Sequence, residues 1–207
     1  LSVGADGGSH QQVEDIAIMR AIPNMRVLVP SDSTTVSKLT WIISQQYGPF
    51  YMRMARSKTP IVHNESQEFQ IGKGIVLQDG SDCTIAACGI TVKIALDAAD
   101  LLKQEGISCR VIDCFSVKPI DKELLEKAAR ETGSIVTCEE HNVMGGFGSS
   151  VAEVVSESYP VPIRRIGVQD KFGESARDNE IPQLFEKHGI TSINIANSVK
   201  EVRGKKP

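Results

Sequence analysis

The chain has 207 residues, of which 41% are hydrophobic, so it is long enough for one large or two modest domains with a buried core. Its formal net charge is −3 and its one short basic run is Lys205-Lys206, which argues against a nucleic-acid or membrane-surface partner. Because no apolar run approaches the length of a membrane span and no signal peptide is visible, we expect no membrane association and a cytoplasmic location.

Five cysteines lie inside or at the ends of predicted strands, and no two of them form a Cys-x-x-Cys pair. They are Cys83, Cys88, Cys109, Cys114 and Cys138. An odd number of thiols without metal-ligand spacing favours buried, reduced cysteines over disulfides or a zinc site.

The first stretch with chemical character runs from Gly4 to Gln12 and combines glycines, one acid and one imidazole. Ser9 and Gln12 fit the capping-box pattern, and apolar residues recur at helical spacing after them. The pattern predicts a helix over about residues 11–21, with His10 in its first turn.

Asp6 lies just before this predicted helix start, where free backbone N–H groups and the helix dipole suit an anion such as phosphate. The glycines would allow the backbone to approach a ligand closely. A carboxylate and an imidazole on one loop, Asp6 and His10, can bind hydroxyls and move protons. A plain glycine-rich helix start explains the same residues, and the pattern alone leaves both interpretations open.

The elements that follow are a short strand over residues 25–29, a helix capped by Ser31 or Ser33, and a strand over residues 50–55. Strand, helix and strand at this spacing indicate a right-handed parallel crossover. Two strands do not make a stable parallel sheet, so we expect further strands from sequence before Leu1 or from a partner chain. We therefore expect a fragment or one piece of a split protein.

Arg56 follows the second of these strands, and ligands of open parallel sheets bind at the carboxyl ends of strands. Its guanidinium has the fork geometry that binds a phosphate through two hydrogen bonds. Position alone favours a solvated arginine beside Lys58. Residues 57–73 are polar and rich in turn formers, which predicts a linker in which His63 is solvated.

A second unit starts near Ile71 with a predicted edge strand over residues 75–77 and a hairpin turn at Asp79-Gly80. Strands and helices then alternate, which predicts a doubly wound, mostly parallel α/β domain. The predicted strands are residues 83–88, 109–114, 134–138 and 163–167, and the predicted helices are 92–104, 121–130, 148–158, 181–187 and 198–203. Three acids, Asp113, Asp121 and Asp178, have the positions of caps or turn residues.

Two further groups of residues in the second unit have compositions that occur in ligand or metal sites. Gly145-Gly146-Phe147-Gly148 opens a helix but lacks the spacing of a nucleotide loop, so close helix–sheet packing or a subunit contact is favoured. Glu139-Glu140-His141 ends a predicted strand, and one histidine beside two acids is an incomplete metal pattern. We interpret these three residues as structural or interfacial.

Four motifs near the amino terminus carry a family resemblance. They are Asp-Gly-Gly-Ser-His-Gln at Asp6–Gln11, Glu-Asp-Ile-Ala at Glu14–Ala17, Arg-Ala-Ile-Pro-Asn-Met at Arg20–Met25, and Val-Pro-Ser-Asp at Val29–Asp32. Together they resemble transketolase. The resemblance covers nearly the whole chain, and it implies that residues 1–70 are the C-terminal part of a pyrimidine-binding domain plus linker. Residues 71–207 would then be the transketolase C-terminal α/β domain.

The resemblance also implies an activity. Transketolases transfer a two-carbon ketol unit between sugar phosphates, with thiamine diphosphate as electron sink and Mg²⁺ as its metal. By motif, Asp6 would bind a substrate hydroxyl, and His10 and Arg56 the phosphate or distal hydroxyls. The motifs that hold the cofactor and metal are absent, so catalytic, cofactor and metal residues would lie mainly outside this chain. We expect inactivity without the N-terminal half or subunit, and a homodimer formed through both domains.

Three alternatives stay open at this point. Deoxyxylulose-phosphate synthase has a similar Asp-Gly-x-x-His-Gln loop, although its strand usually ends in Pro-Arg-Gly where this chain has Ala55-Arg56-Ser57. The β chain of a 2-oxo acid dehydrogenase normally carries a Gln-His-Ser loop instead. A non-catalytic assembly or dimerisation module is the alternative of another class.

Overall fold

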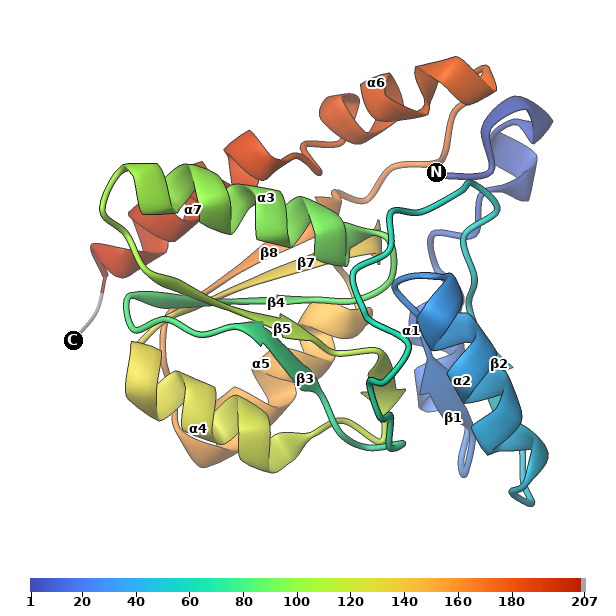
Figure 1. Cartoon of the computed structure of the whole chain (residues 1–207). Helices are drawn as coiled ribbons and strands as arrows, with labels where there is room; N and C mark the ends of the chain where they lie inside the picture. Colours follow the sequence, from blue (N-terminus) through green and yellow to red (C-terminus); the bar gives the residue numbers. More distant parts are fainter. Residues whose placement is uncertain (206–207) are drawn as a thin grey trace.

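Two sheets of unequal size organise the chain, in a computed structural model that describes residues 1–205 (Figure 1). The strands are β1 (Arg26–Leu28), β2 (Phe50–Met52), β3 (Ile75–Gln78), β4 (Cys83–Ala87), β5 (Cys109–Asp113), β6 (Ser116–Lys118), β7 (Ile135–Asn142) and β8 (Ile163–Val168). The helices are α1 (Asp15–Ala21), α2 (Ser33–Ser44), α3 (Thr91–Gln104), α4 (Lys122–Thr132), α5 (Phe147–Ser158), α6 (Ile181–Lys187) and α7 (Ser192–Arg203). Three short 3-10 turns are η1 (Gly4–Asp6), η2 (Gly8–His10) and η3 (Asp178–Glu180).

The larger sheet has the strand order β3-β5-β4-β7-β8. Its strands are parallel except for β3, which pairs antiparallel with β5 at the edge. Helices α3 and α7 cover one face and α4 and α5 the other, so the predicted doubly wound α/β class is confirmed (Figure 1). The predicted hairpin turn at Asp79-Gly80 is wrong, because β3 does not pair with β4. Asp79 instead accepts a hydrogen bond from Arg110 Nε at 2.8 Å.

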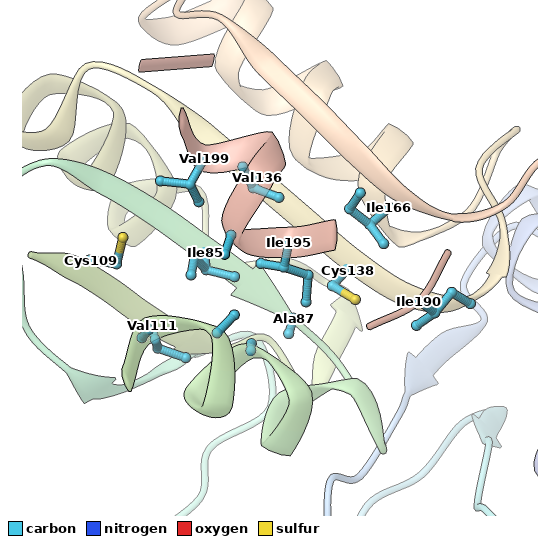
Figure 2. Close-up of a cluster of buried hydrophobic side chains, with 14 of the residues drawn as sticks. Ile85, Ala87, Cys109, Val111, Val136, Cys138, Ile166, Ile190, Ile195 and Val199 are labelled. Atoms are coloured by element: carbon cyan, nitrogen blue, oxygen red, sulfur yellow. The ribbon is translucent and has the colours of Figure 1, made fainter. Parts of the chain in front are cut away.

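The core consists of two layers, one on each face of this sheet. Along β4 the side chains alternate, so that Cys83, Ile85 and Ala87 join the layer under α3 and α7. Ala86 and Cys88 join the opposite layer under α4 and α5. Figure 2 shows the first layer, with side chains from four strands gathered beneath α7.

All five cysteines are buried and free of disulfides, as the sequence predicted. Burial raises the pKa of Cys138 to about 12, with the Thr91 hydroxyl opposing this and the charge of Glu139 adding to it. The thiol therefore stays protonated and behaves as a small apolar side chain.

The first helix begins later than predicted. Gln11 is extended and α1 starts at Asp15, so Ser9 is not its cap and His10 does not lie in its first turn. Ser9 Oγ instead lies 3.1 Å from His10 Nδ1. The cap of α2 is neither predicted serine but Asp32, which accepts a hydrogen bond from Thr35 N at 2.8 Å.

The smaller sheet has the order β2-β1-β6. Strands β1 and β2 are parallel, which confirms the predicted crossover, but the third strand was expected from outside the chain. It is β6, which follows β5 directly and pairs antiparallel with β1. The Lys118 ammonium connects β6 to the end of α1 by donating to the carbonyl oxygens of Arg20 and Ile22, each at 2.7 Å. The second unit thus completes one side of the first unit's sheet, while β2 keeps an open edge among the described residues.

The connection between β2 and β3 contains no helix or strand, as expected for a linker, but it is not free of the core. His63 was predicted to be solvated and is only 3% exposed. Its Nε2 lies 2.8 Å from Asp113 Oδ2, which also accepts a hydrogen bond from Ser31 Oγ at 2.7 Å. Asp113 is therefore not a cap, whereas Asp121 does cap α4 by accepting from Leu124 N.

Within residues 1–205, no helix is both long and apolar enough to cross a membrane.

We predict that His63→Ala lowers the free energy of unfolding by about 1–3 kcal/mol, because the buried Asp113 carboxyl loses a hydrogen-bond partner. Urea denaturation measures this difference. Glu65→Ala, at an exposed linker position, should change stability by less than about 0.5 kcal/mol. Equal effects of the two substitutions would contradict the role assigned to His63.

Candidate functional site

A cleft of about 310 Å³ lies where the end of β2 faces the first turns of the chain. It is lined by the acid–imidazole loop (residues 4–11) and its neighbours on one side and by the residues after β2 on the other. The lining residues are Leu1, Ser2, Val3, His10, Gln11, Gln12, Asp15, Tyr51, Met52, Arg53, Met54, Arg56 and Glu140. The cleft thus opens at the carboxyl end of a parallel strand, the usual ligand position in such sheets.

Two of the three residues predicted from the sequence, His10 and Arg56, line this cleft, and the third, Asp6, contacts Arg56. Arg56 Nη1 and Asp6 Oδ2 form an ion pair, and the same nitrogen donates to Val3 O at 3.4 Å. Both side chains are about half exposed, at 55% for Arg56 and 44% for Asp6. His10 and Arg56 line the same cleft. Asp6 is not a lining residue, but its carboxylate is paired with the Arg56 guanidinium. Their role toward a ligand stays a prediction.

The His10 side chain is exposed, and within residues 1–205 its one hydrogen bond joins Nδ1 to Ser9 Oγ. Its Nε2 makes no hydrogen bond within the described part of the chain, so that nitrogen is available to a hydroxyl or a phosphate oxygen. The expected helix-terminal anion site is not formed, because the residue ends a 3-10 turn. A ligand at this position would therefore meet side chains and not the end of an α-helix.

The floor of the cleft is a buried ionic network that the sequence analysis did not anticipate. Arg53 donates to Asp15 Oδ2 through Nε at 3.1 Å and to Glu140 Oε2 through Nη1 at 3.2 Å. Its remaining nitrogen donates to Gln12 O at 2.9 Å, and Tyr51 OH donates to Asp15 Oδ2 at 2.6 Å. Tyr51 and Arg53 lie two residues apart, which is the spacing that places side chains on one side of a strand. This spacing was the one feature of the sequence that could have indicated that the two side chains share a partner.

Charge compensation in this network is visible in the pKa of Glu140. Burial opposes ionisation of this carboxyl, but the neighbouring Arg53 guanidinium acts the other way, and the pKa lies well below its ordinary value. Glu140 is therefore an anion at neutral pH. Burial together with the neighbouring carboxylate of Asp15 raises the pKa of Tyr51, so the phenol stays protonated and donates to that carboxylate.

The rest of the Glu139-Glu140-His141 stretch is structural, in line with its interpretation from sequence. Glu139 accepts hydrogen bonds from Phe147 N at 2.6 Å and Gly148 N at 2.8 Å, which satisfies the first turn of α5. His141 Nε2 accepts from Ala17 N at 3.3 Å. These contacts tie the end of β7 to α5 and to α1.

The glycines before α5 serve close packing, as predicted. A Cβ at Gly146 would lie 2.2 Å from Glu139 Oε2, and one at Gly148 would lie 2.5 Å from Thr137 Oγ1. Neither distance can be tolerated, so larger residues would displace α5 from the sheet.

No group of three or more His, Cys, Asp or Glu residues within 1–205 is arranged to hold a metal ion.

Comparison with known families and proteins agrees with this geometry. Residues 1–62 match the transketolase pyrimidine-binding domain and residues 72–195 the transketolase C-terminal domain. The two-sheet α/β fold and these two matches together place the chain among transketolase-like proteins. The chain belongs to the transketolase family, of which it carries the pyrimidine-binding and C-terminal portions, and members of this family depend on thiamine diphosphate.

Three similar proteins illustrate the relationship. A "putative transketolase C-terminal section" from Methanocaldococcus jannaschii is 42% identical over 97% of this chain and 63% of its own length. A 1-deoxy-D-xylulose-5-phosphate synthase from Heliobacterium modesticaldum is 39% identical over 97% of this chain and 31% of its own length. A solved structure described as "split gene transketolase, inactive beta4 tetramer" is 44% identical, with a TM-score of 0.89 over 97% of this chain and 64% of that one. The chain therefore spans less than two thirds of each.

We predict that Arg53→Met lowers the free energy of unfolding at pH 7 by about 3–5 kcal/mol, since it leaves two buried carboxylates uncompensated. Arg164→Met is the matched control, because Arg164 is exposed on β8 and its side chain makes no hydrogen bond or ion pair with the described residues. Urea denaturation of both variants compares them. A loss as small as that of the control would contradict the role of the network.

The same network predicts a pH dependence. The folded pKa of Glu140 is about 2, below its ordinary value of 4.5, so its contribution to stability is present above pH 4.5. It is lost as the pH falls through the folded pKa. Urea denaturation between pH 5 and pH 2 should therefore show a smaller acid-induced loss in Glu140→Gln than in the parent chain. An unchanged acid profile would exclude Glu140 as a source of this dependence.

Proposed function

We propose that the chain is the C-terminal portion of a transketolase that transfers a two-carbon ketol unit between sugar phosphates, and that its cleft binds the substrate phosphate. The observation that carries the proposal is the convergence of an exposed guanidinium, a carboxylate and an imidazole at one strand end. Arg56 and Asp6 are in contact, and His10 lines the same cleft as Arg56.

Each side chain has a role that its chemistry supports. The Arg56 guanidinium binds two phosphate oxygens through parallel N–H donors, and it is exposed enough to do so. An incoming phosphate replaces the carboxylate of Asp6 at that guanidinium. Asp6 is then free to accept a hydrogen bond from a sugar hydroxyl, and His10 reaches a phosphate oxygen or a distal hydroxyl.

The donor set of the cleft suits a sugar phosphate and not a magnesium diphosphate. Its accessible groups are the guanidinium of Arg56 and the imidazole of His10, whereas Asp15 and Glu140 are already committed to Arg53. Thiamine diphosphate, when bound, provides the sink that holds the carbanion. We assign the cofactor and Mg²⁺ mainly to residues outside this chain, and we place the boundary between the pyrimidine-binding part with its linker and the C-terminal domain near residue 70.

A partner polypeptide is part of the proposal. Strand β2 has an open edge, and Met54, which lines the cleft just beyond it, is 56% exposed. On the faces of α1 and α2, Ile18 is 58% and Trp41 70% exposed. An open parallel strand beside exposed apolar side chains is the surface expected where further strands pack. We assign this surface to the N-terminal subunit in a cytoplasmic dimeric enzyme.

The alternative with a specific observation in its favour is deoxyxylulose-phosphate synthase, since a synthase is 39% identical over 97% of the chain. A product assay on the complete enzyme separates the two activities. Sedoheptulose 7-phosphate from pentose phosphates supports transketolase. Deoxyxylulose phosphate with CO₂ from pyruvate supports the synthase.

We predict that Arg56→Met, in the enzyme reconstituted with its partner, raises the KM for phosphorylated sugars about 10- to 150-fold, as expected for the loss of a charge-assisted contact. The KM for a non-phosphorylated ketose should change little. Lys58→Ala, which removes an exposed neighbouring cation, is the control. Unchanged kinetics in Arg56→Met would favour an assembly module without a substrate site.

We further predict that the 207-residue chain alone, supplied with thiamine diphosphate and Mg²⁺, does not turn over xylulose 5-phosphate, because the cofactor residues lie elsewhere. Adding the partner subunit should restore turnover. Steady turnover by the isolated chain would overturn the assignment of the cofactor site.

A further inference from the structure

Residues 171–180, here called the strap, leave β8 and lead into α6 across the acid–imidazole loop, on the side of the N-terminal turns (Figure 1). Asp178 Oδ1 accepts a hydrogen bond from Ala5 N at 3.1 Å. Gln11 Nε2 donates to the carbonyl oxygen of Glu174 at 2.7 Å. The second unit therefore holds the loop near both of its ends.

The glycines of the loop are explained by this contact. A Cβ at Gly4 would lie 2.2 Å from Asp178 Oδ1. One at Gly8 would lie 2.6 Å from the carbonyl oxygen of Gly173. The sequence suggested that these glycines admit a ligand, but the structure shows that they admit the strap. At Gly8 backbone lies against backbone, and at Gly4 the Asp178 carboxylate lies against the loop, so both positions favour glycine.

The strap and the cleft occupy different sides of the loop. Among the described residues, those that line the cleft include His10 and Arg56 but none from the strap. Within the loop, the backbone bonds are few: Gly7 N donates to Gly4 O at 3.1 Å, His10 N to Gly7 O at 3.0 Å and Gln11 N to Gly8 O at 3.2 Å. Two 3-10 turns rich in glycine have little stiffness of their own, so their shape depends on what packs behind them.

The strap is itself anchored. The Glu174 carboxylate forms an ion pair with Lys187 on α6 at 2.5 Å, and Arg177 N donates to Glu180 Oε2 at 2.9 Å. Helix α6 contributes Leu184 and Phe185 to the buried part of the second unit. The loop is thus connected to a packed element through a short, hydrogen-bonded segment.

We infer that the strap is a positioning element for the sugar-phosphate cleft, and that Asp178 is a positioning residue that acts through Ala5 on the neighbouring Asp6. The inference rests on the proposed function, and it gives the C-terminal domain a part in substrate recognition. A loop that is ordered before the substrate arrives loses less conformational entropy on binding. The strap therefore lowers the KM for phosphorylated sugars and leaves the chemical step unchanged.

The first test uses the 207-residue chain and needs no activity. In Asp178→Ala, amide hydrogen exchange at Ala5, Gly7 and His10 should be about 10-fold faster, while exchange in β7 stays unchanged. Asp178→Asn keeps an acceptor oxygen and should exchange like the parent. Asp100→Ala, at an exposed position on α3 without a side-chain contact among the described residues, is the matched control. Unchanged loop exchange in Asp178→Ala would overturn the inference.

The second test measures kinetics of the enzyme reconstituted with its partner. Asp178→Ala should raise the KM for phosphorylated sugars about 5- to 10-fold with kcat changed less than about 2-fold, and Asp178→Asn should restore the KM. If Arg56→Met raises the KM and Asp178→Ala does not, the strap inference fails and the proposed function stands. If neither raises it, the phosphate site fails and the inferred role of the strap in substrate binding fails with it.

Discussion

The buried contact of Arg53 with Asp15 and Glu140 is the interaction on which the rest of the structure depends. The three residues come from the segment after β2, from α1 and from β7, so one guanidinium joins the small sheet, its covering helix and the large sheet. An isolated carboxylate at either position would be expensive to bury, and the shared cation offsets that cost. The relative placement of the two units follows from the need to bring both carboxylates to this one cation.

The two arginines beyond β2 show how burial separates structure from recognition. The Arg53 side chain is 13% exposed and has all its nitrogens bonded, whereas that of Arg56 is 55% exposed and holds one exposed carboxylate. The first cannot leave its partners without exposing buried charge. The second exchanges its partner at low cost, because an ion pair in water contributes little. One strand end thus carries a fixed cation and an exchangeable one.

Periodicity and turn residues were sufficient to predict the alternating strands and helices of the second unit. The strands there are recognisable because their apolar side chains enter the core layers on both faces of the sheet. They were not sufficient for β6, which has three residues and is stabilised by pairing with β1 far away in sequence. His63 was misassigned for a similar reason, since its partner Asp113 lies on another element. Of the candidate site, the motifs indicated Asp6, His10 and Arg56, whose role toward a ligand stays a prediction. The floor beneath them was not predicted, because apart from the spacing of Tyr51 and Arg53 its charge pairs join residues far apart in sequence.

Strand β6 has a consequence for how such a chain can be divided or recombined. The strand is encoded beyond the linker, yet it forms one side of the sheet that lies before the linker. A recombination joint in residues 57–73 would therefore separate β1 and β2 from the edge strand β6. The main-chain polar groups along that side of β1 would then be open to solvent. The structure therefore favours keeping the two sheets on one polypeptide over separating them at the linker.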